Sequence, residues 1–132
     1  MIIVFAMSAE PEHWKDQPDG HDYPAAADYL ELVLPRTVVD RLVGTLRTAE
    51  TVHKKAKDLE RASGLPILPP DNPHVAQDLE KVRKGGRLSP VLLVRGALGS
   101  CVPLTVADGY HRICASYHLD EDADIPCRLV DL

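Results

Sequence analysis

The residues with the clearest capacity for chemistry lie together in the stretch Asp108-Gly109-Tyr110-His111-Arg112. An apolar run at residues 104–106 precedes them and an amphipathic pattern follows through residue 119, so we expect a buried strand to pass into a helix here. The first N–H groups of a helix lack an internal partner, and together with the helix dipole they favour anions such as phosphate. Gly109 would let a ligand approach the backbone, and His111 and Arg112 place two donors beside the same helix start. The alternative is an ordinary capped helix that carries two polar surface residues.

Asp108, His111 and Arg112 each have a chemical and a structural interpretation. Asp108 can cap the helix, or it can hold a metal ion or a hydroxyl group. Arg112 can grip phosphate through two hydrogen bonds, or it can form a salt bridge to Asp108 or to the acidic turn at residues 120–124. His111 can donate to phosphate or move a proton near neutral pH, or it can make a structural hydrogen bond to a strand carbonyl. His118 lies two helical turns further on, about 10 Å away, so it cannot share a metal ion with His111 and is expected at the surface or in a capping role.

Three further residues are candidates for the same site. Asn72 and His74 stand at the predicted start of another helix, which would face the same cleft as Gly109. The alternative is that Asn72 only initiates the turn and that His74 is exposed. Tyr110 can stack on a base, or it can pack in the core, as aromatic residues at a helix start commonly do.

Composition sets limits on the class of protein. At 132 residues the chain fits one domain that needs no disulfide or metal to fold, and its formal net charge of −5 argues against indiscriminate binding to nucleic acid or anionic lipid. Cys101, Cys114 and Cys127 form no zinc-finger or disulfide pattern, so we expect free thiols, with Cys114 and Cys127 packed in the core. The apolar start, residues 1–7, is too short to span a membrane and lacks the basic residues of a signal peptide. Met1 and Met7 both remain candidates for the natural start, and a cytoplasmic location is expected.

The chain divides into an extended arm at residues 1–23, a helical extension at 24–64 and a core at 65–132, with 24–132 forming one compact domain. Periodicity and breakers predict an α+β fold, in which a small mixed β-sheet is surrounded by helices. Helices are expected at 24–33, 36–49, 51–63, 74–84 and 110–119. Strands are expected at 65–68, 91–95, 102–107 and 125–130, with the second and third forming a hairpin. The basic side chains of 51–63 could meet phosphate or form a solvated helix surface.

Residues 65–131 resemble the ParB/sulfiredoxin superfamily, in particular a small stand-alone bacterial group with a ParB-like nuclease domain. The resemblance is carried by the Asp71-Asn72-Pro73 turn, the Gly109-x-His111-Arg112 signature between a strand and a helix, and the Ile125-Pro126 strand. It implies a turn that cradles nucleotide phosphates, with Gly109, His111 and Arg112 matching that turn and Asp108 matching an acidic residue of nuclease-like members.

Two departures from the superfamily narrow the expected function. Sulfiredoxins carry a catalytic cysteine directly after the glycine, where this chain has Tyr110, so sulfinate repair is not expected. ParB proteins continue into a helix-turn-helix DNA reader, whereas this sequence ends after the predicted last strand. Specific DNA binding is therefore not expected either.

The sequence thus predicts a domain that binds a nucleotide or a phosphorylated small molecule through Gly109, Tyr110, His111, Arg112, Asn72 and His74. Any catalysis would be phosphoryl transfer or phosphodiester hydrolysis with Asp108 and His111 as catalytic residues and with Mg²⁺ and ATP or CTP as cofactors. No protein-bound metal site, zinc or haem is expected, and no membrane association. The alternative is a non-catalytic protein-interaction module, such as an antidote partner of another bacterial protein, which would use the acidic arm and the basic helices as docking surfaces.

Overall fold

A four-stranded mixed sheet organises the fold in the computed structural model, which describes residues 13–132. The strands lie in the order β1-β4-β2-β3, and only β2 and β4 run parallel to each other. Their bounds are β1 Thr51–Lys55, β2 Val91–Val94, β3 Thr105–Asp108 and β4 Asp124–Val130. The helices are α2 Asp22–Leu30, α3 Arg36–Thr48, α4 Ala56–Ser63, α5 Pro73–Arg83 and α6 Tyr110–Leu119, with a short 3-10 turn η2 at Leu98–Ser100. The predicted α+β class with a small mixed sheet is confirmed.

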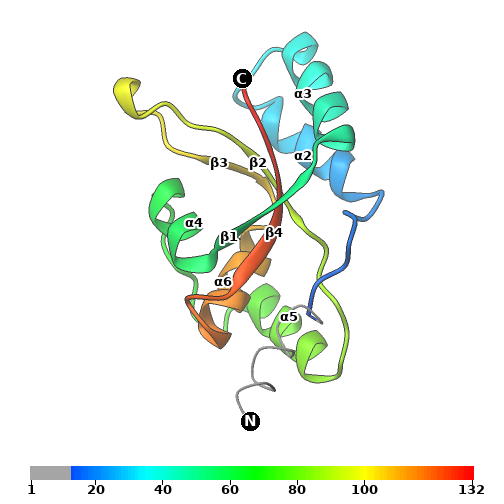
Figure 1. Ribbon diagram of the computed structural model, residues 1–132, viewed down its shortest axis with the longest axis vertical. Helices are drawn as coiled ribbons and strands as arrows, with labels where there is room; N and C mark the ends of the chain where they lie inside the picture. Colours follow the sequence, from blue (N-terminus) through cyan, green and yellow to red (C-terminus); the bar gives the residue numbers. More distant parts are fainter. Residues whose placement is uncertain (1–12) are drawn as a thin grey trace.

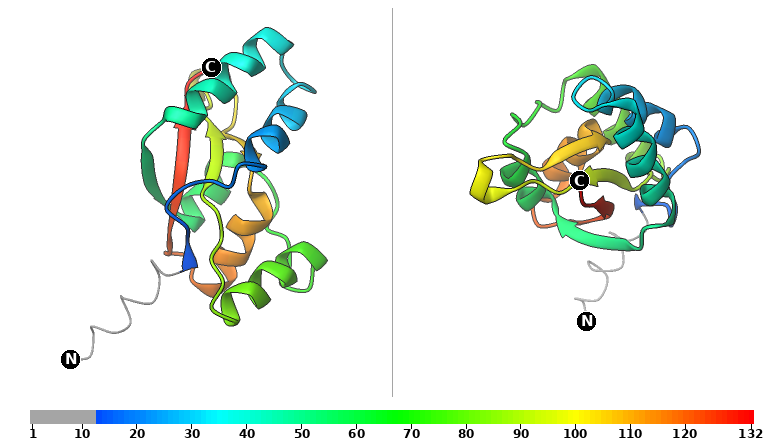
Figure 2. Two further views of the ribbon diagram at one scale, coloured as in Figure 1. Left: turned by 90° about the vertical axis from the view of Figure 1, so that its right-hand side faces the viewer. Right: turned by 90° about the horizontal axis from the view of Figure 1, so that it is seen from above.

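Strand β2 is buried on both faces because helices pack on each side of the sheet. Leu92 and Val94 belong to one apolar cluster with residues of α2 and α3, whereas Val91 and Leu93 belong to another with residues of α4 and α6. Helix α5 packs against α6 rather than on the sheet, with Val75 as its buried contact. Figure 1 shows α2 and α3 towards one end of the long axis and α5 and α6 towards the other, and Figure 2 shows the same separation from the side.

The predicted helix at 51–63 is wrong in its first five residues, which form the edge strand β1. Thr51 to Lys55 pair in antiparallel register with Arg128 to Asp124 of β4, and α4 begins only at Ala56. The long basic side chains of this segment are exposed and fit either structure, so pairing with β4 decides the outcome. The expected helical extension at 24–64 therefore contributes one strand to the sheet.

Two predicted strands differ from the structure because of prolines. Residues 65–68 form no strand, since Pro66 and Pro69 interrupt the backbone donors that a ladder would need. The strand expected at 102–107 begins only at Thr105, after Pro103. The helix expected from residue 24 starts earlier, at Asp22, with Pro24 in its first turn. The other helices and strands lie within a few residues of their expected bounds.

Part of the expected extended arm packs against the rest of the chain, while residues 1–12 lie outside the described residues. Trp14 is buried and forms a parallel bridge with Leu88, with hydrogen bonds from Leu88 N to His13 O at 2.7 Å and from Lys15 N to Leu88 O at 2.8 Å. Residues 13–15 are therefore held by backbone hydrogen bonds as well as by apolar burial.

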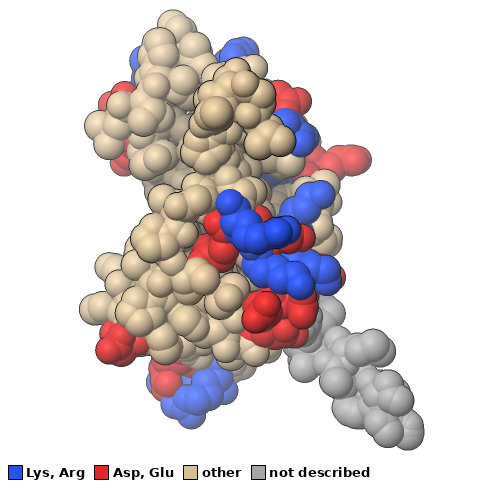
Figure 3. Space-filling view, turned by 90° about the vertical axis from the view of Figure 1, so that its left-hand side faces the viewer, with Lys and Arg blue, Asp and Glu red and all other residues tan. Residues whose placement is uncertain are grey.

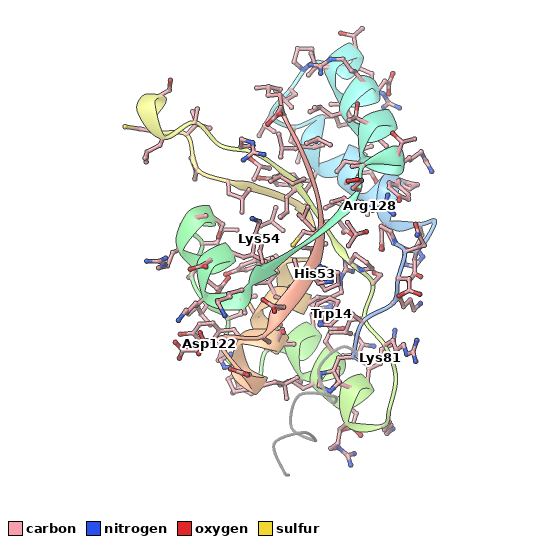
Figure 4. The ribbon with its side chains drawn as sticks, in the orientation of Figure 1. Trp14, His53, Lys54, Lys81, Asp122 and Arg128 are labelled. Atoms are coloured by element: carbon pink, nitrogen blue, oxygen red, sulfur yellow. The ribbon has the colours of Figure 1, made fainter. Side chains whose placement is uncertain are left out.

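Arg128 of β4 is buried and connects its own strand to three other segments (Figure 4). It donates to Gln17 Oε1 at 2.6 Å, to Thr51 Oγ1 at 3.2 Å and to the carbonyl oxygens of Leu46 and Arg47, both at 3.1 Å. Its charge lies at the C-terminal end of α3, where carbonyl groups lack helical partners and the helix dipole favours a cation.

The two basic side chains of α4 are paired with acidic ones. Lys57 lies 2.6 Å from Asp122, and Arg61 lies 2.9 Å from Asp58. Figure 3, which views the molecule from the side on which α4 lies in Figure 1, shows Lys and Arg gathered among Asp and Glu. This arrangement fits the solvated helix surface better than a phosphate-binding face.

Candidate functional site

A pocket of about 140 Å³ lies between the beginning of α5 and the beginning of α6. It brings together five of the residues expected at the site, namely His74, Asp108, Gly109, His111 and Arg112. Two further residues of α5, Gln77 and Asp78, complete its lining. The candidate helix starts, which are distant in sequence, therefore do face a common cleft.

Gly109 makes the turn from β3 into α6. Its φ of +110° favours glycine, and a Cβ atom there would lie 2.5 Å from Val91 Cγ1 and 2.7 Å from Arg112 Nη2. The space beside its Cα atom is thus filled by other parts of the protein. The conformation of Gly109 allows α6 to start against β2, and it sets the position of Arg112.

No side chain caps the start of α6. Ile113 is the first residue of α6 whose backbone N–H donates to a preceding carbonyl oxygen, that of Gly109 at 3.1 Å. Within the described part of the chain, the N–H groups of residues 110–112 have no such backbone acceptor. Because Gly109, His111 and Arg112 line the pocket, this uncapped helix start is next to it.

Arg112 is held by two carboxylates and a carbonyl oxygen. Its Nη2 atom donates to Asp108 Oδ2 at 3.2 Å and to Pro90 O at 3.4 Å, and its Nη1 atom lies 3.9 Å from Asp22 Oδ1. The side chain is 17% exposed, and its buried Nε atom has no partner. The salt bridge to Asp108 that the sequence allowed is therefore present, and Arg112 also has one unused donor.

Asp22, like Asp78, is a residue near this site that sequence reasoning missed. It is buried at the start of α2, where its Oδ2 atom accepts from Ser89 Oγ at 2.7 Å and from Asp19 N at 3.1 Å. Asp22 and Arg112 are 90 positions apart in the sequence, which gives no spacing signal. Only the packing of α2 beside β3 brings the two side chains together.

Two half-buried carboxyl groups face the pocket from opposite sides. Burial raises the pKa of Asp108, and the nearby carboxyl of Asp22 adds to this rise while Arg112 opposes it. Burial also raises the pKa of Asp78, against the opposing charges of Arg112 and His111. The pocket therefore combines carboxyl groups, imidazoles and one guanidinium rather than carrying charge of a single sign.

The two histidines of the pocket lie ring to ring. The centroids of His74 and His111 are 4.7 Å apart, and their planes are inclined by 41°. Burial, and then the neighbouring His74, lower the pKa of His111, so its imidazole is neutral over a wider pH range than usual. A neutral imidazole can accept a proton or bind a metal ion.

Asn72 and Tyr110 do not line the pocket. The side chain of Asn72 caps α5 by accepting from the N–H groups of His74 at 3.0 Å and Val75 at 3.2 Å. Tyr110 packs beside the cluster formed by Val75, Cys114 and Ala115. Of the two interpretations for each residue, the contacts favour turn formation for Asn72 and core packing for Tyr110.

A second polar cluster lies under α6, away from the pocket lining. Glu60 is 5% exposed, and its Oε2 atom accepts from Cys114 Sγ at 3.9 Å. The Oε1 atom of Glu60 and the hydroxyl of Tyr110 are buried and have no partner. Burial raises the pKa of Glu60 from 4.5 to about 7. Cys114 and Cys127 are both buried and free, as predicted, whereas Cys101 is exposed.

Among residues 13–132, one group of three metal-ligating side chains has ligand atoms that all lie within 4.8 Å of one another, namely Asp19, His21 and Asp22. His21 is exposed, and the other two members of the group are acidic. Asp22 already accepts two hydrogen bonds, as described above.

No family model, curated protein or solved structure matches the chain. No helix within residues 13–132 is long and apolar enough to cross a membrane.

Proposed function

We propose that the pocket binds the phosphate group of a nucleotide or of another phosphorylated small molecule. The observation that carries the proposal is the uncapped start of α6, which lies against the pocket beside His74, His111 and Arg112. Free N–H groups at a helix start favour an anion, and Arg112, which also lines the pocket, adds a positive charge nearby.

The carboxyl groups of Asp78 and Asp108 determine whether the phosphate ligand would bind alone or together with a cation. They would repel an uncompensated polyphosphate, so we propose that ATP or CTP binds together with Mg²⁺, an ion that prefers carboxylate and phosphate oxygens. Asp78 and Asp108 are the residues that suit this ion. Any phosphoryl transfer or phosphodiester hydrolysis would use His111 as the group that accepts a proton, since its lowered pKa keeps it neutral near pH 7.

Calorimetric titration with ATP, CTP, GTP and inorganic phosphate, each with MgCl₂, tests the proposal. We expect wild-type protein to bind at least one of them, and we expect His111→Ala and Arg112→Lys to weaken that binding by about tenfold or more. His53→Gln is the matched control, because His53 is exposed on β1 outside the pocket (Figure 4). Circular dichroism verifies that each variant is folded. No heat with any ligand, or equal affinity in His111→Ala and wild type, would refute the proposal.

A protein-interaction role is the second candidate, and the β2–β3 hairpin favours it. Leu98 at the hairpin tip is 95% exposed, and Val102 beside it is 50% exposed. Large apolar side chains at such a projecting tip are typical of contact surfaces. Pull-down from the native host with wild type and Leu98→Asp would support this role if one partner were lost with the variant. Identical sets of captured proteins would contradict it.

A further inference from the structure

We propose that His74, Asp78 and His111 form a binding site for one divalent transition-metal ion, such as Zn²⁺ or Co²⁺. The three side chains line the same pocket. His74 and Asp78 are four residues apart on α5, so both project from one face of that helix, and His111 approaches from α6. The inference rests on the proposed function in one respect, because the ion would lie where a phosphate oxygen could complete its coordination. With that ion bound, His111 and Asp78 would serve as its ligands in place of the proton-accepting and Mg²⁺-binding roles proposed above.

The arrangement of the two imidazoles fits a shared ion. A nitrogen ligand lies about 2.0–2.1 Å from zinc, so two imidazoles on one tetrahedral ion have ring centres roughly 5 Å apart. The rings of His74 and His111 are already 4.7 Å apart, although they belong to different helices. Binding of one ion would therefore need rotation of the two side chains rather than movement of α5 relative to α6.

Asp78 is the carboxyl group that is free to complete the site. Asp108 is paired with Arg112 at 3.2 Å, and Asp22 is engaged by Ser89. Within residues 13–132, Asp78 makes no hydrogen bond or ion pair through its side chain, even though it is half-buried in the pocket. Its negative charge would be compensated by a bound cation.

The identity of the donors selects the class of metal. Two imidazole nitrogens and one carboxylate favour zinc, cobalt, nickel or iron over magnesium and calcium, which prefer oxygen ligands only. Three protein ligands leave at least one coordination position open, and a pocket of about 140 Å³ leaves room for water or a phosphate oxygen there. Such an ion would also offset the repulsion between an incoming phosphate and the carboxyl groups.

The ligand atoms of these three residues do not all lie within 4.8 Å of one another in the structure, in contrast to those of Asp19, His21 and Asp22. His74 is exposed and the other two side chains are partly exposed, so rotation about their own bonds would bring them together on the ion. The group of Asp19, His21 and Asp22 has closer ligand atoms but is the weaker candidate. Its Asp22 already accepts hydrogen bonds from Ser89 and from the backbone of Asp19, and it also faces Arg112.

Titration of the chelator-treated full chain with ZnCl₂ or CoCl₂, in a buffer without phosphate, tests the metal site. We expect one ion per chain, and the visible absorption of bound Co²⁺ should report nitrogen ligands. His74→Ala, Asp78→Asn and His111→Ala should each weaken binding by about tenfold or more. His21→Ala, which tests the competing group, and His53→Gln should bind as wild type does.

Each outcome decides between the two proposals. Absence of an ion bound one to one, or unchanged affinity in both His74→Ala and Asp78→Asn, would overturn the metal site, and loss of binding in His21→Ala alone would move it to the Asp19 group. Phosphate binding with MgCl₂ by wild type, when wild type binds no Zn²⁺ or Co²⁺, would leave the proposed function standing. One Zn²⁺ or Co²⁺ ion bound per chain, with no binding of any phosphate ligand, would leave the metal site standing and overturn the proposed function.

Discussion

Replacing Glu60 with glutamine should remove a loss of stability that wild-type protein suffers as the pH rises. The carboxyl group of Glu60 is 5% exposed, its Oε1 atom has no partner, and its other oxygen has only the thiol of Cys114 at 3.9 Å. Removal from water disfavours the charged form, and burial raises the pKa of Glu60 from 4.5 to about 7.

The sign follows from proton binding in the folded and unfolded states. Between about pH 4.5 and 7 the folded protein retains the proton of Glu60, while the unfolded chain releases it. Raising the pH through this window therefore lowers the free energy of unfolding, and the loss levels off above pH 7. At about 1.4 kcal/mol for each tenfold change in proton affinity, the full effect is about 3 kcal/mol.

Urea unfolding of wild type, Glu60→Gln and the control Glu50→Gln at pH 4.5 and pH 8 measures this effect. Glu50 is exposed, so its variant should follow the pH dependence of wild type. The free-energy advantage of Glu60→Gln over wild type should grow by about 3 kcal/mol from pH 4.5 to pH 8. An advantage that stays constant over this range would show that Glu60 titrates as an exposed carboxyl does, and the reasoning from burial would fail.

Four other substitutions test the structure through the free energy of unfolding. Gly109→Ala should destabilise the protein by about 2 kcal/mol because of the positive φ and the contact with Val91. Gly44→Ala, in open space within α3, should stabilise it by about 0.5–1 kcal/mol. Equal effects of the two substitutions on the free energy of unfolding would contradict the role given to the conformation of Gly109. Arg128→Met should cost about 3 kcal/mol, since buried carbonyl groups at the end of α3 lose their charged donor, and a cost under 1 kcal/mol would oppose that role. Asn72→Ala should cost about 1 kcal/mol through loss of the α5 cap while leaving phosphate affinity unchanged; weaker phosphate binding would instead place Asn72 in the site.

Much of the fold could be predicted from local pattern. The apolar run at Val91–Val94 identified a strand covered on both faces, and the helices beginning at Arg36 and Tyr110 followed their periodicity. The strand at Thr51–Lys55 could not be predicted in the same way. Its exposed basic residues carry no alternating pattern, and its structure is set by pairing with β4, about seventy residues later.

The candidate site could be predicted only in part. The turn at Gly109 and the donors of His111 and Arg112 were visible because they are adjacent in sequence, and His74 was visible as part of a helix start. Asp22 and Asp78 were not identified. Each acquires its place from packing between elements, α2 beside β3 and α5 beside α6, which no local spacing encodes.

The most direct test of phosphate binding at the start of α6 is a ¹H–¹⁵N chemical-shift titration of the protein with ATP, CTP and inorganic phosphate in the presence of MgCl₂. The account predicts saturable shifts that are largest at the backbone amides of Tyr110, His111 and Arg112, with the amides of α3 unmoved. Saturable shifts centred on another element, or no shifts with any of the three ligands, would contradict it.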